Sequence, residues 1–585
     1  MADLATTVEA MPSGRSLLDR KLTKSSGRAG IAFFLMALGS GLCYIAFHVA
    51  RDLDTVTITS AWPYLLLGLA LLIALGFEFV NGFHDTANAV ATVIYTHSLD
   101  PTIAVVWSGL CNLAGVLFSS GTVAFAIITL LPVELILQVS SGAGYSMIFA
   151  LLIAAIVWNL STWWFGLPAS SSHTMVGSII GVGIANQLLS IHSGTSGVDW
   201  EQAIKVLKVL LISPLVGFGC AAVLMMVLKP DKRKLGCSLL AVLAALVSYF
   251  LFQESPWLSL GIGVALAAAI WFVFRLLPIN DALFEAPKNN QPPPWPIRAL
   301  LLLTCSGVSF SHGSNDGQKG MGLIMLILIG TVPTAYALNH AVTASDIQQF
   351  IAASEQAGHI LDRHVDKTGI LGPDPRAEVT DYIRTKQLQP DTVLALRELV
   401  EDLNHEVALY KVFKSVPAQD QTNVRNDMYV ASEALRLMAK NHDPAFTAEE
   451  SAVLANYKSK VDKATKFIPD WVKVAVALAL GLGTMVGWKR IVVTVGERIG
   501  KQHLAYAQGA SAELVAMATI FAANIWGLPV STTHVLSSGV AGTMAANGSG
   551  LRLATVRNIA AGWVLTLPAA ALLSGLLYWL FRAIA

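Results

Sequence analysis

The stretch GFEFVNGFHDTANA, residues 76–89, decides the fold because it places a histidine and carboxylates inside an otherwise apolar run. A second stretch, GVSFSHGSNDGQKG at residues 307–320, matches it at several Gly and Phe positions. The tenth residue of both copies is aspartate, Asp85 in the first and Asp316 in the second. A carboxylate in the middle of a membrane costs roughly 2.5–3.5 kcal/mol on insertion scales. Two of them at matching positions therefore indicate one shared functional site.

The composition around these stretches is that of a membrane protein. Of the 585 residues, 54% are hydrophobic and 13% are charged, whereas soluble domains carry about a quarter charged residues. Several apolar runs reach the ~20 residues with which a helix crosses a bilayer, among them residues 31–50, 102–131, 206–228 and 258–277. A large soluble α-helical core would not need so many runs of this length. The five cysteines form no C-x-x-C pair, and the net charge of +1 indicates no class of partner.

A second pair of motifs also repeats, GLPASSSHTMVGS at residues 166–178 and GLPVSTTHVLSSG at residues 527–539. In each, Gly and Pro break a helix, and the hydroxyl residues that follow favour the start of a new one. We predict two re-entrant helical hairpins whose second arms start at these hydroxyls, where free N–H groups and the positive helix dipole converge. Such a site suits a tetrahedral oxyanion, whereas simple capping of buried helix breaks would not require two copies. The hydroxyl residues are Ser170, Ser171, Ser172, Ser531, Thr532 and Thr533.

Loop charges give the two halves opposite orientations. Lys and Arg concentrate in cytoplasmic loops, which places the N-terminal segment, residues 229–234 and residues 488–501 inside. Threaded through these points, the first acidic motif runs inward and the second runs outward. The predicted fold class is therefore an all-α polytopic membrane protein with inverted-topology repeats, two re-entrant helical hairpins and a soluble helical insert. In such folds the substrate site lies near the midplane, between the repeats.

The predicted division of the chain follows from these motifs. The first apolar run is expected to be retained as a span and not cleaved, and the charged stretch after the second acidic motif is expected to be a helical insert with no chemistry of its own. The segments are an N-terminal tail with an extra transmembrane helix (residues 1–61), a first repeat with a hairpin near 146–185 (62–228), two linking transmembrane helices with a Pro-rich cytoplasmic linker (229–297), the start of the second repeat (298–336), the periplasmic insert (337–470) and the remainder of the second repeat with a hairpin near 508–546 (471–585).

The motifs alone leave the roles of the acidic residues open. Asp85 and Asp316 are candidates to bind a coupling cation, to hydrogen-bond a protonated anion or to hold a metal that accompanies the substrate. The alternative is a structural ion pair with Lys319. His84 stands where the other copy has Asn315, and an imidazole takes up a proton near neutral pH whereas an amide cannot. His84 is therefore either a proton site or a structural residue.

Further polar residues in the apolar runs are candidates for supporting roles. His173 and His534 each follow a hydroxyl cluster, and they either donate to the anion or hold the hairpin in place. Glu78, Asn81 and Glu513 also lie within predicted spans. Nothing in the sequence assigns these three residues a role.

The four motif copies resemble those of the inorganic phosphate transporter (PiT) family. The acidic motif is present as GFHDTAN and GSNDGQK and the hairpin motif as PASSSH and PVSTTH, in the family's order, across residues 65–336 and 472–580. The FHD variant, the extra N-terminal span and the insert are most similar to bacterial low-affinity, proton-coupled Pit transporters. The resemblance implies a non-enzymatic secondary transporter of the bacterial inner membrane, commonly a homodimer, that imports inorganic phosphate with protons.

The resemblance also implies which residues bind. Phosphate would contact the six hydroxyl residues of the hairpins, framed by the two aspartates. The implied coupling-ion residues are His84, Asp85, Asn88, Asn315 and Asp316. His84 in place of the family's usual Asn, and Lys319 where the first motif has Asn88, both put a sodium site in doubt. The resemblance implies no cofactor apart from H⁺ as coupling ion and a divalent metal such as Mg²⁺ that accompanies phosphate, with no metal site fixed by the protein alone. Its partners would be phosphate and membrane lipid, with no nucleic acid.

Other functions were weighed against this one. A transporter of another tetrahedral oxyanion such as sulfate, or a sodium-coupled phosphate symporter, would use the same scaffold. A passive anion channel would not need buried carboxylates, which repel anions. An intramembrane hydrolase would have to use Ser172 and His173, but adjacent residues on a helix do not face each other as a nucleophile and base must.

Overall fold

The computed structural model describes residues 28–53, 62–85, 87–137, 141–189, 198–252, 256–276, 281–285, 287 and 292–584. Every regular element among these residues is helical, apart from an isolated bridge between Gly500 and Leu551. The all-α class predicted from the sequence is therefore confirmed. Five helices of the described part are long and apolar enough to cross a membrane, or up to seven spans if each of two bent helix pairs counts as one.

Two helices of the first half, which start at residues 142 and 200, begin directly after side-chain capping residues. Ser141 Oγ accepts a hydrogen bond from the Gly144 N–H at 3.2 Å, and Asp199 Oδ1 accepts one from the Gln202 N–H at 3.2 Å. The helices are α2 (Arg28–Leu53), α3 (Trp62–Asp85), α4 (Ala87–Tyr95), α5 (Pro101–Leu117), α6 (Thr122–Ile128), α7 (Val133–Leu137), α8 (Gly142–Trp164), α9 (Ser171–Leu189) and α10 (Trp200–Leu228).

One span predicted from hydropathy is wrong as a continuous helix. The apolar run at residues 102–131 is divided between α5 and α6, whose axes are bent by 76° at the break. Gly121 lies at the break with φ of 86°, in the left-handed region that glycine adopts without steric cost. Hydropathy does not detect this turn because the residues on both sides of it remain apolar.

The second half is built from a long helix, an insert and a further set of broken helices. The linking elements are α11 (Arg233–Phe252), α12 (Pro256–Leu276) and η1 (Asp281–Phe284), followed by α13 (Trp295–Thr331) and α14 (Pro333–Tyr336). The insert contains α15 (Ala344–His364), α16 (Pro375–Thr385), α17 (Thr392–Tyr410), η2 (Phe413–Ser415), α18 (Gln421–Asn441) and α19 (Ala448–Thr465). The chain ends with α20 (Asp470–Thr484), α21 (Lys489–Val493), η3 (Thr494–Arg498), α22 (Tyr506–Ile525), α23 (Thr532–Asn547) and α24 (Leu553–Ile584).

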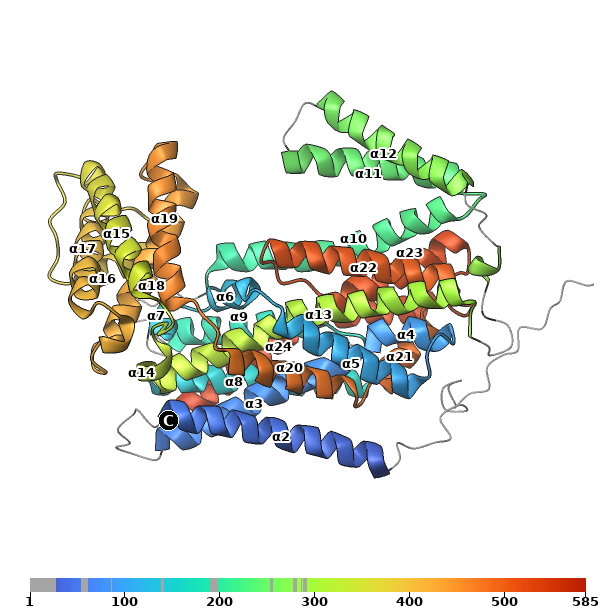
Figure 1. Ribbon diagram of the computed structural model, residues 1–585, viewed down its shortest axis with the longest axis horizontal. Helices are drawn as coiled ribbons and strands as arrows, with labels where there is room; N and C mark the ends of the chain where they lie inside the picture. The colour runs from blue at the N-terminus through green and yellow to red at the C-terminus, as the bar shows by residue number, and fades with distance from the viewer. Residues whose placement is uncertain are drawn as a thin grey trace, which may run out of the picture.

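The two halves interlock in the main body of the molecule. In this body α9 packs along α24, α23 along α10, α5 along α13 and α3 along α20. Figure 1 shows the insert as a separate bundle at one end of the body, while α11 and α12 extend away from it on another side. The insert is tied to the body by Lys386 Nζ, 2.6 Å from Asp199 Oδ1, and by Asn426, which donates to the Leu137 carbonyl at 3.3 Å.

Two glycines set the spacing of the helices that carry the acidic motifs. A Cβ atom added at Gly82 of α3 would collide with the backbone of Leu480 in α20, and one at Gly313 of α13 would collide with the backbone of Asn112 in α5. Each glycine lies three residues before the aspartate of its motif. Close helix packing therefore fixes the position of both carboxylates.

Candidate functional site

Asp85 is the last residue of α3 and lies at the centre of a buried polar cluster. Its Oδ1 accepts from Thr533 Oγ1 at 2.7 Å and lies 2.9 Å from His84 Nδ1. The other ring nitrogen of His84 lies 3.1 Å from Thr162 Oγ1 on α8. The Asp85 carboxylate therefore belongs to the first half of the chain, and it accepts a hydrogen bond from a hydroxyl of the second half, that of Thr533 at the start of α23.

Asp316 lies in the middle of α13 and has a cationic partner. Lys319 Nζ is 2.6 Å from Asp316 Oδ1, and the lysine also contacts Ser172 Oγ at the start of α9. Ser172 Oγ in turn donates to the Val530 carbonyl, just before α23, at 2.9 Å. The ion pair predicted as an alternative for Asp316 is therefore present, and its lysine also reaches the hydroxyl cluster.

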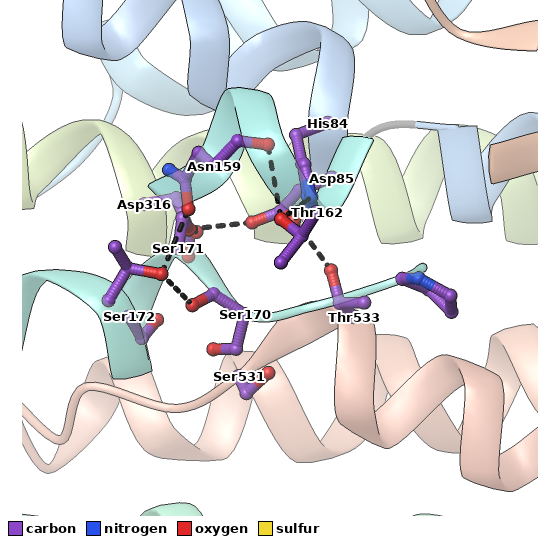
Figure 2. Close-up of polar contacts among 12 residues, drawn as sticks. His84, Asp85, Asn159, Thr162, Ser170, Ser171, Ser172, Asp316, Ser531 and Thr533 are labelled. Carbon is purple, nitrogen blue, oxygen red and sulfur yellow. Dashed lines mark hydrogen bonds and ion pairs between the residues drawn. The ribbon is translucent and has the colours of Figure 1, made fainter. Parts of the chain in front are cut away.

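Ser171 joins the two acidic motifs. Its Oγ lies 2.6 Å from Asp85 Oδ2 and 3.1 Å from Asp316 Oδ2, and both aspartates are almost fully buried. Figure 2 shows this side chain, at the first turn of α9, close to Asp316 and Asp85. A single hydroxyl hydrogen serves only one carboxylate at a time. Two buried carboxylates this close to one hydroxyl therefore favour binding of a proton or a cation.

The first hydroxyl of each cluster caps a helix. Ser170 Oγ accepts from the His173 N–H at 3.2 Å, and Ser531 Oγ accepts from the His534 N–H at 3.1 Å. The two breaks thus have the same local hydrogen bonding, and α9 and α23 start close to the aspartates. Among the described residues Thr532 Oγ1 has no hydrogen-bond partner, although the side chain is buried.

The two histidines that follow the hydroxyl clusters lie next to each other, with their ring planes tilted by 41°. The ring centroids of His173 and His534 are 4.4 Å apart, and the His534 ring stacks on Trp563 of α24 at 4.1 Å. His173 Nδ1 and His534 Nε2 have no hydrogen-bond partner among the described residues. This arrangement joins the two helix starts directly.

Other predicted residues lie at the edge of the cluster or away from it. Asn315 donates to Asn524 Oδ1 at 2.6 Å, and the carboxylate of Glu78 packs against Gly320, where an added Cβ would collide with it. Glu513 belongs to a different polar group, because it accepts hydrogen bonds from Thr304 at 2.5 Å and from Thr92. The side chain of Asn88 lies outside the described residues. Asn81 donates to Glu78 Oε2 at 3.5 Å.

Sequence reasoning missed His312, which lies one helical turn before Asp316. Its Nε2 is 3.8 Å from Asp316 Oδ2, and its Nδ1 is 2.8 Å from Asn112 Oδ1 on α5. The spacing of four residues on a helix, which places two side chains on one face, could have identified it. Thr162 was also missed, and no sequence signal marks it because its contact with His84 joins residues far apart in the chain.

Comparison with known proteins places these motifs in context. A family described as the phosphate transporter family matches residues 81–574. The chain is 41% identical over 525 residues to the low-affinity inorganic phosphate transporter PitA of Escherichia coli strain K12, with 88% of this chain and 96% of the relative covered. It is 37% identical over 528 residues to PitB of the same strain, with the same coverage. A solved structure described as the sodium-dependent phosphate transporter is similar with a TM-score of 0.49 and 18% identity, covering 89% of this chain and 100% of that one. These relatives are named as transporters, so an enzymatic function is not indicated.

Proposed function

Because the chain belongs to the phosphate transporter family, we propose that it imports inorganic phosphate by proton symport, as a secondary active transporter that works by alternating access. It is a multi-pass membrane protein, and we place it in the bacterial inner membrane. The observation that carries the proposal is the position of Ser171, whose hydroxyl lies within hydrogen-bond distance of both Asp85 and Asp316. One side chain at the start of a broken helix thereby connects the acidic motifs of both halves.

The packing of the helices supports an inverted repeat with two re-entrant hairpins. α9 of the first half packs on α24 of the second half, and in the matching pair α23 of the second half packs on α10 of the first. Likewise, the contact of α3 with α20 is matched by the contact of α13 with α5. This reciprocal pairing is what two halves related by a pseudo-two-fold axis produce. A two-fold axis in the membrane plane would place the starts of α9 and α23 at the bilayer midplane, where such transporters bind their substrate.

The cluster supplies groups of the kind that phosphate requires. Two helix N-termini offer backbone N–H groups and positive dipole ends to an anion. Hydroxyls of Ser171, Ser172 and Thr533 lie next to them, and Lys319 adds a fixed positive charge. A phosphate oxygen could replace the Ser172 hydroxyl as a hydrogen-bond partner of Lys319, which keeps its ion pair with Asp316. The aspartates then restrict binding to phosphate that arrives with protons or with a metal, since carboxylates repel a bare anion.

Proton coupling is proposed because His84 and Lys319 each occupy a position where the other motif copy has an asparagine. A sodium site would need neutral ligands at these positions. His84 contacts Asp85 directly, so a proton on the imidazole would neutralise the carboxylate. Lys319 already provides a cation beside Asp316. Lys319 balances Asp316, and a protonated His84 would balance Asp85, so neither aspartate would need a sodium ion.

The test is uptake of radiolabelled phosphate into proteoliposomes with pH, Na⁺ and Mg²⁺ gradients imposed independently. We expect uptake against a phosphate gradient when the inside is alkaline, competition by arsenate and little competition by sulfate. Uptake driven by Na⁺ and indifferent to the pH gradient would contradict proton coupling. Stronger competition by sulfate than by arsenate would contradict the substrate.

A further inference from the structure

A partly open cavity of about 310 Å³ lies beside the break of the second hairpin, next to the polar cluster but not part of it. Its walls are the helix α6, the first two turns of α10 and the segment that joins α22 to α23. Of the ten described residues that line it, Lys205 is the only one with a charge. The volume lies at the lower end of the range of about 300–1,000 Å³ that is typical of ligand pockets. The cavity therefore has room for a small hydrated anion.

Lys205 brings an unpaired positive charge to this cavity. Its side chain is exposed and forms no hydrogen bond or ion pair with another residue of the described part of the chain. Glu201, four residues earlier on the same helix, has the spacing of an ion-pair partner, but its carboxylate contacts Lys440 and lies 3.5 Å from Lys386 Nζ. Asp199 lies 2.6 Å from Lys386 as well. Lysines of the insert thus neutralise the acidic residues at the start of α10 and leave the charge of Lys205 available to an anion.

The cavity lies at the outer end of α10. This helix has 29 residues, which at about 1.5 Å per residue make roughly 43 Å, enough to cross the bilayer. It ends directly before residues 229–234, whose basic side chains predict a cytoplasmic loop. Gln202 and Lys205 lie in its first two turns, at the opposite end. The cavity is therefore reached from the outer side of the membrane.

Two walls of the cavity are hydrogen-bonded to the second acidic motif. Asn315 Nδ2 donates to the carbonyl of Leu528, a lining residue, at 3.2 Å. The N–H of Val123, in the first turn of α6, donates to Gln318 Oε1 at 2.9 Å. Asn315 and Gln318 flank Asp316 on α13. The cavity is thus adjacent to the part of α13 that carries this aspartate.

The matching break of the first hairpin is filled by contacts with the second half of the chain. The carbonyl of Gly166, which matches Gly527, accepts from Thr494 Oγ1 at 2.7 Å. The Trp164 carbonyl accepts from Arg490 Nη1 at 2.6 Å. Both donors belong to residues 488–501, which the loop charges predict to be cytoplasmic. The break near the outer side therefore borders a cavity, whereas the break near the inner side is held closed by its neighbours.

We infer that this cavity is an outer vestibule, in which Lys205 and Gln202 bind inorganic phosphate before it reaches the aspartates. The inference rests on the proposed function and deepens it by adding a first binding site for the substrate. The ten described lining residues include no carboxylate, so a bare phosphate anion is not repelled there, as it is at the acidic cluster. A positive charge in a cavity also raises the local concentration of anions and the rate of their capture.

The first experiment measures initial rates of phosphate uptake as a function of phosphate concentration. Lys205→Gln should raise KM about three- to fivefold, the effect of one exposed charge pair, and leave the maximal rate unchanged because only capture is weakened. The wild-type KM should rise with ionic strength, since salt screens an exposed charge, and the variant should respond less. Lys208→Gln is the matched control, at an exposed lysine of the same helix that does not line the cavity. An unchanged KM in Lys205→Gln, or an equal rise in both variants, would overturn the vestibule.

The second experiment detects the anion in the cavity without transport. Thr122 lines the cavity and is exposed, so Thr122→Cys, in a protein whose five natural cysteines are replaced, reports access of a hydrophilic thiol reagent. In lipid-free detergent, inorganic phosphate at twice its dissociation constant should slow the modification about threefold, because mass action leaves a third of the sites empty. Potassium chloride at equal ionic strength should not slow it, and Lys205→Gln should abolish the protection.

A phospholipid headgroup presents the same phosphate chemistry as the free anion. Protection that requires phospholipid and is independent of inorganic phosphate would assign the cavity to lipid and overturn the inference. Failure of the proposed function is a separate result, because it would show as protection by phosphate in a protein that takes up no phosphate with any gradient. Uptake of phosphate without protection, and with the wild-type KM in Lys205→Gln, would instead refute the vestibule alone.

Discussion

The ammonium group of Lys319 lies 2.6 Å from the carboxylate of Asp316, three residues earlier on the same helix, and both side chains are buried. The matching position in the first acidic motif is Asn88, which carries no charge. The two halves of the site therefore differ by one fixed positive charge. Two matching motifs with such an asymmetry do not contact a substrate in a fully symmetric way.

Replacing Lys319 with Met should destabilise the protein and stop uptake. The change leaves Asp316 buried without its cation, and breaking a buried ion pair in this way costs about 3–5 kcal/mol. The thermal unfolding temperature of the solubilised protein should fall, and phosphate uptake should drop at least tenfold. Scanning calorimetry or a thermal shift assay measures the first effect, and vesicle uptake measures the second.

The double change Lys319→Met with Asp316→Asn separates the two effects. Removing both charges eliminates the unpaired carboxylate, so stability should recover toward the wild-type value. Uptake should remain lost. A single Lys319→Met variant that unfolds at the wild-type temperature would show that the ion pair is not what holds Asp316.

Asp85→Asn and Asp316→Asn should each reduce phosphate uptake to background while the protein still inserts into the membrane. The amide keeps the size of the side chain, but it neither binds a cation strongly nor takes up a coupling proton. Surface expression of the variants, compared with wild type, controls for insertion. Uptake at the wild-type rate in either variant would refute its role in binding.

The motifs predicted the residues at the centre of the site better than the residues that orient them. Asp85, Asp316, Ser171, Ser172 and Thr533 come together as the repeats indicated, because duplicated polar residues in apolar runs have few explanations other than a shared cavity. The residues that orient them were not predictable from one sequence. Thr162 and Asn112 look like ordinary polar residues of apolar helices, and only the packing of α3 on α8 and of α5 on α13 gives them a role.

The fold, too, was predicted where local backbone preferences decide it and was missed where contacts between distant parts of the chain decide it. Long apolar runs and Gly-Pro breaks predicted where α8 ends and α9 begins, since these depend on local backbone preferences. The bend at Gly121 was missed because nothing in the hydropathy marks it, and the reciprocal pairing of α9 with α24 involves contacts between distant parts of the chain. Glu513, a candidate for a supporting role whose part the sequence left open, belongs to a separate group with Thr92 and Thr304.

The first helix of the insert should become less stable in acid. Hydrogen bonds from Lys463 and from Thr343 hold the pKa of Asp346 at about 2. The folded pKa is below the value of about 3.9 in an unfolded chain, so this stabilisation is complete above pH ~4 and is lost as pH falls toward 2. Asp346→Asn should remove that dependence and increase opening at the start of α15 about two- to fivefold. Hydrogen exchange of amides 344–348 measures it, and equal exchange in both proteins at neutral pH would contradict the prediction.

Ser171→Ala should lower phosphate uptake more than tenfold with little change in stability. The hydroxyl contacts both aspartates, and its loss removes from them the donor at the start of α9. Ser161→Ala is the matched control, because the half-buried Ser161 hydroxyl bonds, among the described residues, the Val157 carbonyl of its own helix. The two variants should differ at least tenfold in uptake. Equal uptake would place the connection between the repeats elsewhere.

His84→Asn should change the ion dependence of transport. The imidazole lies 2.9 Å from Asp85 and 3.1 Å from Thr162, so a protonated ring neutralises the carboxylate that phosphate approaches. Wild-type uptake should therefore depend on the external pH. In the variant the amide cannot titrate, and it supplies an oxygen ligand of the kind that sodium prefers. We expect a flatter pH profile, stimulation by Na⁺, or both, measured as initial uptake rates in vesicles over about 3 pH units around neutrality.

The alternative role for His84 makes a different prediction for the same protein. If the ring only positions Asp85, the asparagine variant loses affinity for phosphate but keeps the wild-type pH profile, since the titrating group lies elsewhere. A second substitution, His84→Gln, preserves the reach of the side chain toward Thr162 and should behave like asparagine if the proton matters, but more like wild type if only geometry matters. An unchanged pH profile together with a raised KM in the asparagine variant alone would therefore make His84 a positioning residue, and the coupling proton would then have to be carried by one of the aspartates.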